Sequence, residues 1–215
     1  MRAARILFLL GLQLITITLA NAAARDYLVP PGEKVEGVSQ EELSVQWWQW
    51  AGSFAYEASP IADTKGDKCG AGQQGKVFFL AGTYESTVTR RTCKVPAGRY
   101  LFFPIINYVV MPSNCSGCLT CKDAEASAKS MTNNLGRIFA ELDGEQLPSV
   151  GNHRAASPAC FNLAERMKGA PKIEPTASNG YYLLLKPLPK GTHKLRFGAE
   201  LPSLRQGLEY TLIVE

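Results

Sequence analysis

The stretch GYYLLLKPLPKGTHKLRFGAELPSLRQGLEYTLIVE, residues 180–215, decides the fold class of this protein. It holds three runs, 180–186, 192–199 and 208–215, which are separated by segments that contain proline or glycine. In the second and third runs apolar residues alternate with polar ones, as expected of strands that bury one face. We therefore predict that the chain ends in three β-strands.

Earlier runs of similar character indicate further strands. Residues 76–80 and 87–93, joined by the turn-like GTYES, predict a β-hairpin. The run Tyr100–Phe103 is apolar on both faces, which is typical of a central strand. Pro104 follows it, and because proline has no backbone N–H, we expect the strand to break or bulge there. Asp143–Gly144 lies between two more strand-like runs and predicts another hairpin.

Two segments carry helical patterns. In the segment SQEE, residues 39–42, Ser39 is placed to cap a helix and Glu42 to reach back as its capping-box partner. We expect this helix to end near Ala58 and to bury one apolar stripe, made of Leu43, Trp47, Trp50 and Phe54. A second helix is expected over residues 122–136, with Asp123 as its cap.

These elements predict a mainly β (α+β) fold. The chain shows no alternation of strands with helices, so a parallel α/β sheet is not expected. We predict a β-sandwich, with a jelly roll as one form of it, that carries two peripheral helices and disulfide-pinned loops. Residues 25–215 are expected to form a single domain with a Cys-rich loop and helix inserted at about 108–136.

The first residues predict export. Arg2 and Arg5 precede an apolar run over residues 6–19, and Ala20–Ala24 offers the small residues of a cleavage site, so residues 1–24 form a predicted signal peptide. The apolar run is shorter than the roughly 20 residues that a membrane-spanning helix needs. We therefore expect a secreted or periplasmic protein with no membrane association after cleavage.

The charge balance argues against a nucleic-acid partner. The formal net charge is +4 at pH 7, and Arg2 and Arg5 of the predicted leader contribute to it. No long basic run is present, and Arg90–Arg91 is interpreted as ordinary solvated charge.

The six cysteines predict disulfides, because an even number behind a signal peptide is typical of an oxidised protein; they are Cys69, Cys93, Cys115, Cys118, Cys121 and Cys160. The predicted hairpin would bring Cys93 within reach of Cys69, and closing a loop of about 25 residues contributes about 3.5 kcal/mol in the chain-entropy model. Three pairings of the other four stay open, and we expect Cys160 to tie the 115–121 cluster to the C-terminal half.

A zinc site and a redox pair are two other interpretations of the cysteine cluster. A zinc site would need a fourth ligand from Cys160 or His153, and a redox pair would use Cys118 and Cys121 before a helix. Structural disulfides account for the same spacing, so no metal or cofactor is expected.

Several motifs together resemble an uncharacterised group of secreted bacterial proteins. They are WWQW, GQQGKVFFLAGT, the R-x-C-x-VPAG segment that leads into LFFPIIN, and LKPLPKGTHKLRF. The similarity covers roughly residues 45–107 and 180–215. It implies bacterial export and brings no activity with it.

Nucleophilic catalysis is not expected. The chain has no G-x-S-x-G elbow, and its two histidines are His153, in a polar loop, and His193, at a strand end. A glycosidase needs only two carboxylates, for which Asp63 and Asp67, with Glu57 nearby, are the candidates. The same aspartates could hold calcium or simply cap turns, and turn capping is the interpretation that we favour.

Trp48 and Asn107 are candidate ligand contacts. Trp48 points about 100° away from Trp47 on the helix and could stack on a sugar ring or a partner protein, although burial of a wide helix face is the alternative. Asn107 follows a buried strand and could line a pocket edge. We therefore predict a disulfide-stabilised binding module for a glycan or a protein partner, which uses Trp48, Asp63, Asp67 and Asn107. A glycan-acting hydrolase or lyase, and a metal-handling protein, are the alternative hypotheses.

Overall fold

The computed structural model describes residues 22–116, 120–133, 135–201 and 204–215. The first 21 residues of the predicted signal peptide and Cys118 lie outside this range. The mainly β prediction is confirmed. The strands are β1 (Val77–Phe79), β2 (Val88–Val95), β3 (Tyr100–Val110), β4 (Ile138–Leu142), β5 (Glu145–Gln146), β6 (Arg154–Ala156), β7 (Ala177–Leu185), β8 (Gly191–Leu201) and β9 (Leu204–Val214).

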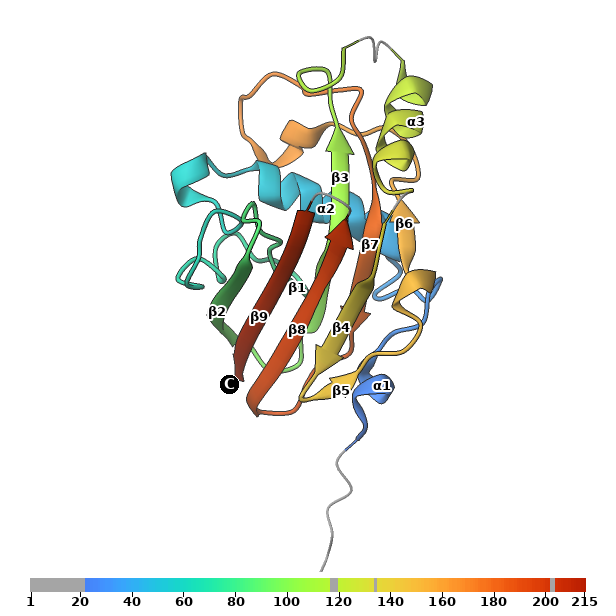
Figure 1. Ribbon diagram of the computed structural model, residues 1–215. Helices are drawn as coiled ribbons and strands as arrows, with labels where there is room; N and C mark the ends of the chain where they lie inside the picture. The colour runs from blue at the N-terminus through green and yellow to red at the C-terminus, as the bar shows by residue number, and fades with distance from the viewer. Residues whose placement is uncertain (1–21, 117–119, 134, 202–203) are drawn as a thin grey trace, which may run out of the picture.

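The strands form two mixed sheets (Figure 1). One has the order β1-β3-β7-β6 and the other the order β2-β9-β8-β4-β5. Between them lies a continuous apolar core, in which the rings of Phe103 and Phe197 are 4.6 Å apart. Leu195, Phe197 and Leu212 are fully buried there, which confirms the prediction that the last two strands bury one face.

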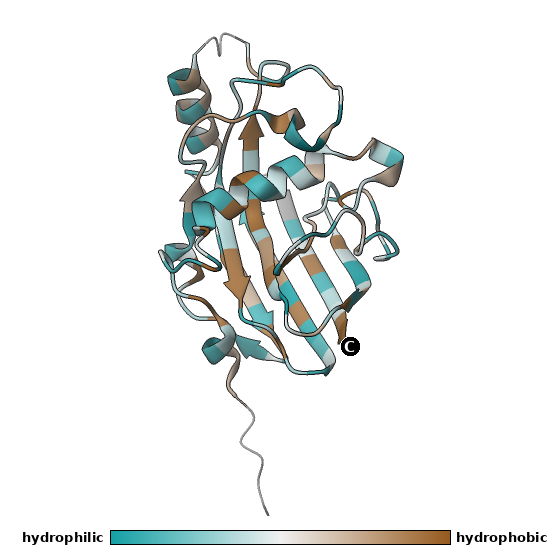
Figure 2. Cartoon of the chain, turned by 180° about the vertical axis from the view of Figure 1, so that it is seen from behind, coloured by the Kyte–Doolittle hydropathy of each residue, from teal (hydrophilic) through white to brown (hydrophobic). Residues whose placement is uncertain are grey.

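Within the described residues, three α-helices accompany the sheets: α1 (Ala24–Tyr27), α2 (Gln40–Gly52) and α3 (Cys121–Met131). Three 3₁₀ turns also occur there: η1 (Tyr56–Ala58), η2 (Val150–Asn152) and η3 (Leu163–Arg166). Seen from behind in Figure 2, α2 lies across the outer face of the β1-β3-β7-β6 sheet. No helix in the described ranges has both the length and the apolarity that crossing a membrane requires.

The start of α2 follows the predicted capping box. Ser39 Oγ accepts from Glu42 N at 3.2 Å, and Glu42 Oε2 accepts from Ser39 N at 2.8 Å. The apolar stripe packs on Phe102 and Tyr182, and Trp47 and Trp50 are fully buried. The helix ends at Gly52 and not near Ala58, because the chain leaves the helix after Gly52 and only re-enters a short turn at η1.

The predicted hairpin between residues 76–80 and 87–93 is wrong, since β1 and β2 belong to different sheets. β1 runs parallel to β3, and β2 runs parallel to β9. The reason lies in burial: Phe78 and Phe79 of β1 face the two apolar layers on opposite sides of their sheet, whereas β2 alternates between buried and exposed residues. A strand apolar on both faces fits the sheet that α2 covers.

The Cys69–Cys93 disulfide nevertheless forms, with a Cα–Cα distance of 5.7 Å. The loop before β1 runs beside β2, where Thr92 N donates to Lys65 O at 2.9 Å, and this contact replaces the hairpin in bringing the two cysteines together. Arg91 is a second correction: it is 3% exposed and donates hydrogen bonds to four backbone carbonyls and the Tyr210 hydroxyl.

Two local predictions are confirmed. The β3–β7 register shifts between Pro104 and Ile106, where a bulge was expected. Asp143 and Gly144 have φ values of 51° and 88° and connect β4 to β5 in an antiparallel hairpin.

α3 covers the end of the sandwich. Ala124 and Ala128 pack on Val110 and Ala177. Thr120, and not Asp123, caps the helix, because Thr120 Oγ1 accepts from Asp123 N at 3.3 Å. The helix ends at Met131, five residues before the expected Gly136.

Disulfides hold α3 in place. Cys121 is joined to Cys160 with a Cα–Cα distance of 5.7 Å, as expected for a link to the C-terminal half. Cys115 is also disulfide-bonded. Disulfides of this kind are typical of an oxidising, non-cytoplasmic compartment.

Candidate functional site

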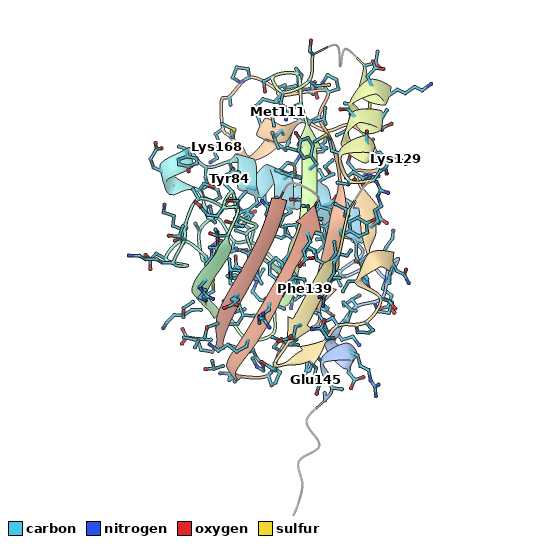
Figure 3. All side chains as sticks on the ribbon, in the orientation of Figure 1. Tyr84, Met111, Lys129, Phe139, Glu145 and Lys168 are labelled. Carbon is cyan, nitrogen blue, oxygen red and sulfur yellow. A yellow bond between two sulfur atoms is a disulfide. The ribbon has the colours of Figure 1, made fainter. Side chains whose placement is uncertain are left out.

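A cavity of about 580 Å³, which we call the binding cavity, lies between α2, β3 and the end of α3. Its volume falls within the roughly 300–1,000 Å³ typical of small-ligand sites. Figure 3 labels two of its lining residues, Tyr84 and Met111. The lining comprises Trp47 and Trp48 of α2, residues 82–84 after β1, residues 104–109 of β3, Met131 and Thr132 at the end of α3, Gln206 and Leu208 of β9, and Ile61, Met111 and Asn114 from loops.

Trp48 forms part of the cavity wall and is half-buried. Its Nε1 donates to the Tyr182 hydroxyl at 3.0 Å, and its ring meets that of Trp47 edge to face at 5.0 Å. Trp47 and Trp50 are instead tied to the core, where their Nε1 groups donate to Leu80 O and Ala71 O. Trp48 therefore presents part of its ring to the cavity.

Asn107 enters the same cavity because of the bulge after Pro104. Opposite it on β7 stands Gly180, where a Cβ atom would come within 2.6 Å of Asn107 Cβ, so the close approach of the strands requires glycine. The Asn107 Nδ2 atom is buried and has no hydrogen-bond partner. Such an atom costs stability unless something in the cavity accepts from it.

Tyr182 is not one of the lining residues, but its hydroxyl contacts the cavity wall by accepting from Trp48. Its side chain is fully buried, and this burial raises the pKa of Tyr182 far above its usual range, although nearby Asn107, Trp48 and Ser178 act in the opposite direction. The hydroxyl therefore stays protonated at physiological pH. Asn107 and Ser178 are close to it, but the Asn107 amide nitrogen and the Ser178 hydroxyl lack aligned partners.

The binding cavity carries no formal charge in the part of the chain that the structure describes. Its polar lining consists of amides and hydroxyls, such as those of Asn107, Asn114 and Thr132. The mouth is rich in apolar surface: Tyr84 is 60% exposed and Met131 51% exposed. This lining suits an uncharged ligand that offers apolar faces and hydrogen-bonding groups.

Asp63 and Asp67 do not lie in the binding cavity. The buried Asp63 carboxylate accepts from the backbone N–H groups of Lys65, Gly66 and Lys68 at 2.8–3.1 Å. Burial opposes its ionisation, but these N–H groups and the nearby Arg91 outweigh burial and hold the pKa of Asp63 below its usual range. Asp67 is exposed. The geometry of Asp63 is that of a turn cap.

The two histidines are far from forming a catalytic pair. His193 contacts Asp143 Oδ2 through Nδ1 at 2.7 Å and Pro189 O through Nε2 at 3.0 Å. His153 is 5% exposed, its Nδ1 has no partner, and burial lowers its pKa.

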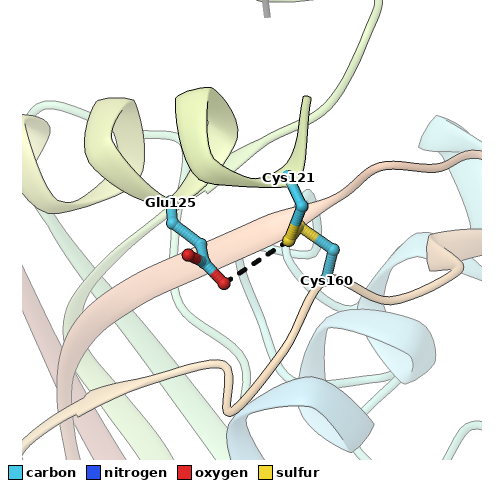
Figure 4. A group of neighbouring side chains, drawn as sticks. All are labelled: Cys121, Glu125 and Cys160. Atoms are coloured by element: carbon cyan, nitrogen blue, oxygen red, sulfur yellow. Dashed lines mark hydrogen bonds between the residues drawn. A yellow bond between two sulfur atoms is a disulfide. The ribbon is translucent and has the colours of Figure 1, made fainter. Parts of the chain in front are cut away.

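The group Cys121, Glu125 and Cys160 is the set of described residues whose spacing would suit a metal ion (Figure 4). The two sulfur atoms are joined in a disulfide, so they offer no thiolate. His153 is not part of this group. Cys121 and Cys160 are therefore bonded to each other and are not available to the zinc hypothesis as ligands.

The sequence singles out Trp48 and Asn107, which line the cavity, but gives no sign of the other lining residues or of Tyr182, which contacts Trp48. Tyr182 lies in a correctly predicted strand, yet nothing in GYYLLLK distinguishes the tyrosine that meets Trp48 from its neighbour Tyr181. Thr132 and Asn114 come from loops and helix ends, whose positions depend on the disulfides and on α3.

Comparison with known proteins adds little. No family model matches this chain, and no curated protein matches it. Among solved structures, the structure of PbICP-C in complex with falcipain-2 matches with a TM-score of 0.31 and 8% sequence identity, covering 66% of this chain and 100% of that chain. A similarity this weak indicates neither a shared fold nor a shared activity. The resemblance to secreted bacterial proteins stays a prediction.

Proposed function

We propose that this protein is a disulfide-stabilised binding module of the periplasm or the cell exterior, and that it holds an uncharged ligand in the binding cavity. The observation that carries this proposal is the Asn107 Nδ2 atom, a buried donor without a partner at the wall of an uncharged cavity. A ligand oxygen beside it would satisfy a group that the folded chain leaves unpaired. Neutral glycans and uncharged peptide segments both offer such oxygens.

Binding is favoured over catalysis by the groups that the cavity contains. Its described lining has no carboxylate, histidine or cysteine, so it offers no acid–base pair for glycan cleavage. Asp63, the buried carboxylate, has a lowered pKa and is saturated by backbone N–H groups, which suits a structural role. These observations weigh against the hydrolase and lyase hypothesis.

The proposed location rests on the predicted signal peptide and the disulfides. Cys69–Cys93 and Cys121–Cys160 would not persist in a reducing cytosol.

The test uses purified mature protein and two panels of probes, namely neutral oligosaccharides such as chitotetraose and cellotetraose, and a library of uncharged heptapeptides. Binding is followed by tryptophan fluorescence, because Trp48 lines the cavity. Asn107→Leu removes the unpaired donor, and the matched control, Asn152→Leu, makes the same change at an exposed position.

We expect at least one probe to bind to the parent protein and the Asn152→Leu control, with at least tenfold weaker binding to Asn107→Leu. If no probe binds, or if the probes bind equally to Asn107→Leu, the proposal is wrong. Cleavage of an oligosaccharide would instead favour the enzyme hypothesis.

A further inference from the structure

One edge of β3 is incompletely paired. β1 pairs with β3 only over Tyr100–Phe102, and Leu80 N then donates to Phe102 O at 3.0 Å. β3 continues to Val110, and no other described strand pairs with it on that side (Figure 1). The binding cavity lies along this edge, because six consecutive residues of β3, 104–109, line it.

Hydrogen bonds on the far side of β7 show which backbone groups of β3 do not pair with β7. Tyr182 N donates to His153 O at 3.0 Å, and Ser157 N donates to Ser178 O at 2.9 Å, so the even-numbered residues of β7 direct their backbone groups towards β6. The odd-numbered residues of β7 must then direct theirs towards β3.

The residues of β3 opposite those odd-numbered positions use their backbone groups in the ladder with β7. They include Ile106, opposite Tyr181, and Tyr108, opposite Asn179. Asn107 lies between these two residues, and Val109 follows Tyr108. The N–H and C=O groups of Asn107 and Val109 therefore point away from β7, towards the unpaired side.

The chain itself caps the upper end of this edge with an amide side chain. Asn114 Nδ2 donates to Val109 O at 3.0 Å, and Met111 N donates to Asn114 Oδ1 at 2.8 Å. Gln73 covers the outer edge of β1 in the same way, exchanging bonds with the backbone of Phe79. Exposed edges are commonly covered to prevent unwanted pairing. The stretch around Asn107 has no such cap among the described residues.

We propose that an extended, uncharged peptide segment of a partner protein pairs with this open stretch of β3; this inference rests on the proposed function and names its ligand class. The partner strand would meet the backbone groups of Asn107, the N–H of Val109 and the Asn107 Nδ2 donor. Addition of a strand to a sheet edge is an established mode of peptide recognition, with main-chain bonds giving affinity and pockets receiving alternate side chains. The apolar surfaces of Trp48, Tyr84 and Met131 are available for those side chains.

The absence of charged side chains from the described lining supports an uncharged peptide as the ligand. A described lining without charged side chains offers no pairing for a charged segment, whose burial would be costly. β1 at one end and the Asn114 cap at the other limit the pairing to a short segment around Asn107.

The experiment selects heptapeptides from a phage-displayed random library on the mature protein and measures amide hydrogen exchange of the complex. We expect enriched peptides without charged residues, and slowed exchange at the N–H groups of Asn107 and Val109. N-methylation of the peptide at alternate positions, which removes edge donors without altering the protein, should weaken binding about tenfold, whereas methylation at the intervening positions should not.

The two proposals fail in different ways. If chitotetraose or cellotetraose binds in an Asn107-dependent manner while no selected peptide protects these two amides, the cavity binds a glycan and the strand-pairing inference is wrong. If selected peptides bind but protect other residues, the inference is also wrong. If neither probe class binds, both proposals are wrong.

Discussion

Replacing Asn107 with leucine should weaken ligand binding at least tenfold without destabilising the fold. Leucine has nearly the same shape as asparagine but no donor. The buried Nδ2 atom has no partner, and an unpaired donor of this kind costs about 1–3 kcal/mol. The amide makes no aligned bond to the neighbouring Tyr182 hydroxyl, but the two polar groups lie close together, and losing this contact offsets about 1 kcal/mol of that gain. We therefore expect the free energy of unfolding to stay unchanged or to rise by up to about 2 kcal/mol.

Asn179→Leu is the matched comparison, because Asn179 lies on the neighbouring strand and is fully used. Its Oδ1 accepts from Thr132 Oγ1 at 2.7 Å and from Arg154 Nε at 2.8 Å. Removing it takes the acceptor from the Arg154 guanidinium and leaves Thr132 Oγ1 only its longer bonds to the carbonyls of Ala128 and Lys129, so we expect a loss of about 3 kcal/mol. Urea unfolding followed by tryptophan fluorescence measures both variants. If Asn107→Leu loses as much stability as Asn179→Leu, the Asn107 amide serves the fold and is not reserved for a ligand.

Three further predictions concern stability. Replacing Cys121 and Cys160 with serine opens a loop of 39 residues and should cost about 4 kcal/mol, measured by thermal unfolding; an unchanged Tm would show that the disulfide does not constrain the unfolded chain. Arg91→Met leaves buried carbonyls unpaired and should lower the free energy of unfolding by about 3–5 kcal/mol, measured in urea. Arg90→Met, on the exposed face, should lower it by under about 1 kcal/mol, and equal losses would contradict a structural role for Arg91. Burial lowers the pKa of His153, so the unfolded chain binds a proton more readily: stability should be full above about pH 6.5 and fall as the pH drops below it, and His153→Gln should reduce this dependence.

Local chemistry in the sequence was enough to predict much of the fold. The capping box at Ser39, the bulge at Pro104 and the turn at Asp143–Gly144 each depend on a few neighbouring residues, and the structure contains all three. The mainly β class followed from short alternating runs. These features are local because φ and ψ preferences, missing N–H groups and side-chain periodicity act within a few residues.

Pairing between distant segments was decided by the tertiary structure. The segments of β1 and β2 fitted a hairpin, yet each found a parallel partner elsewhere, since the choice depended on which sheet offered apolar cover on both faces. The same limit applies to Arg91: its sequence neighbourhood looks solvated, and only the surrounding carbonyls from distant loops make its burial favourable.

For the binding cavity, too, the sequence indicated individual residues, and the tertiary structure decided how they are arranged. The sequence singled out Trp48, by its angle on the helix, and Asn107, by its place after a buried strand, but it could not show that they line one cavity. It also proposed Asp63 and Asp67, which the structure places elsewhere, because a carboxylate in a glycine-rich loop has the same local pattern whether it caps a turn or binds a ligand. The unpaired Nδ2 of Asn107 and the open edge of β3 are properties of what lies opposite in space. A sequence states which groups each residue carries, whereas only the packed chain decides which of those groups remain without a partner.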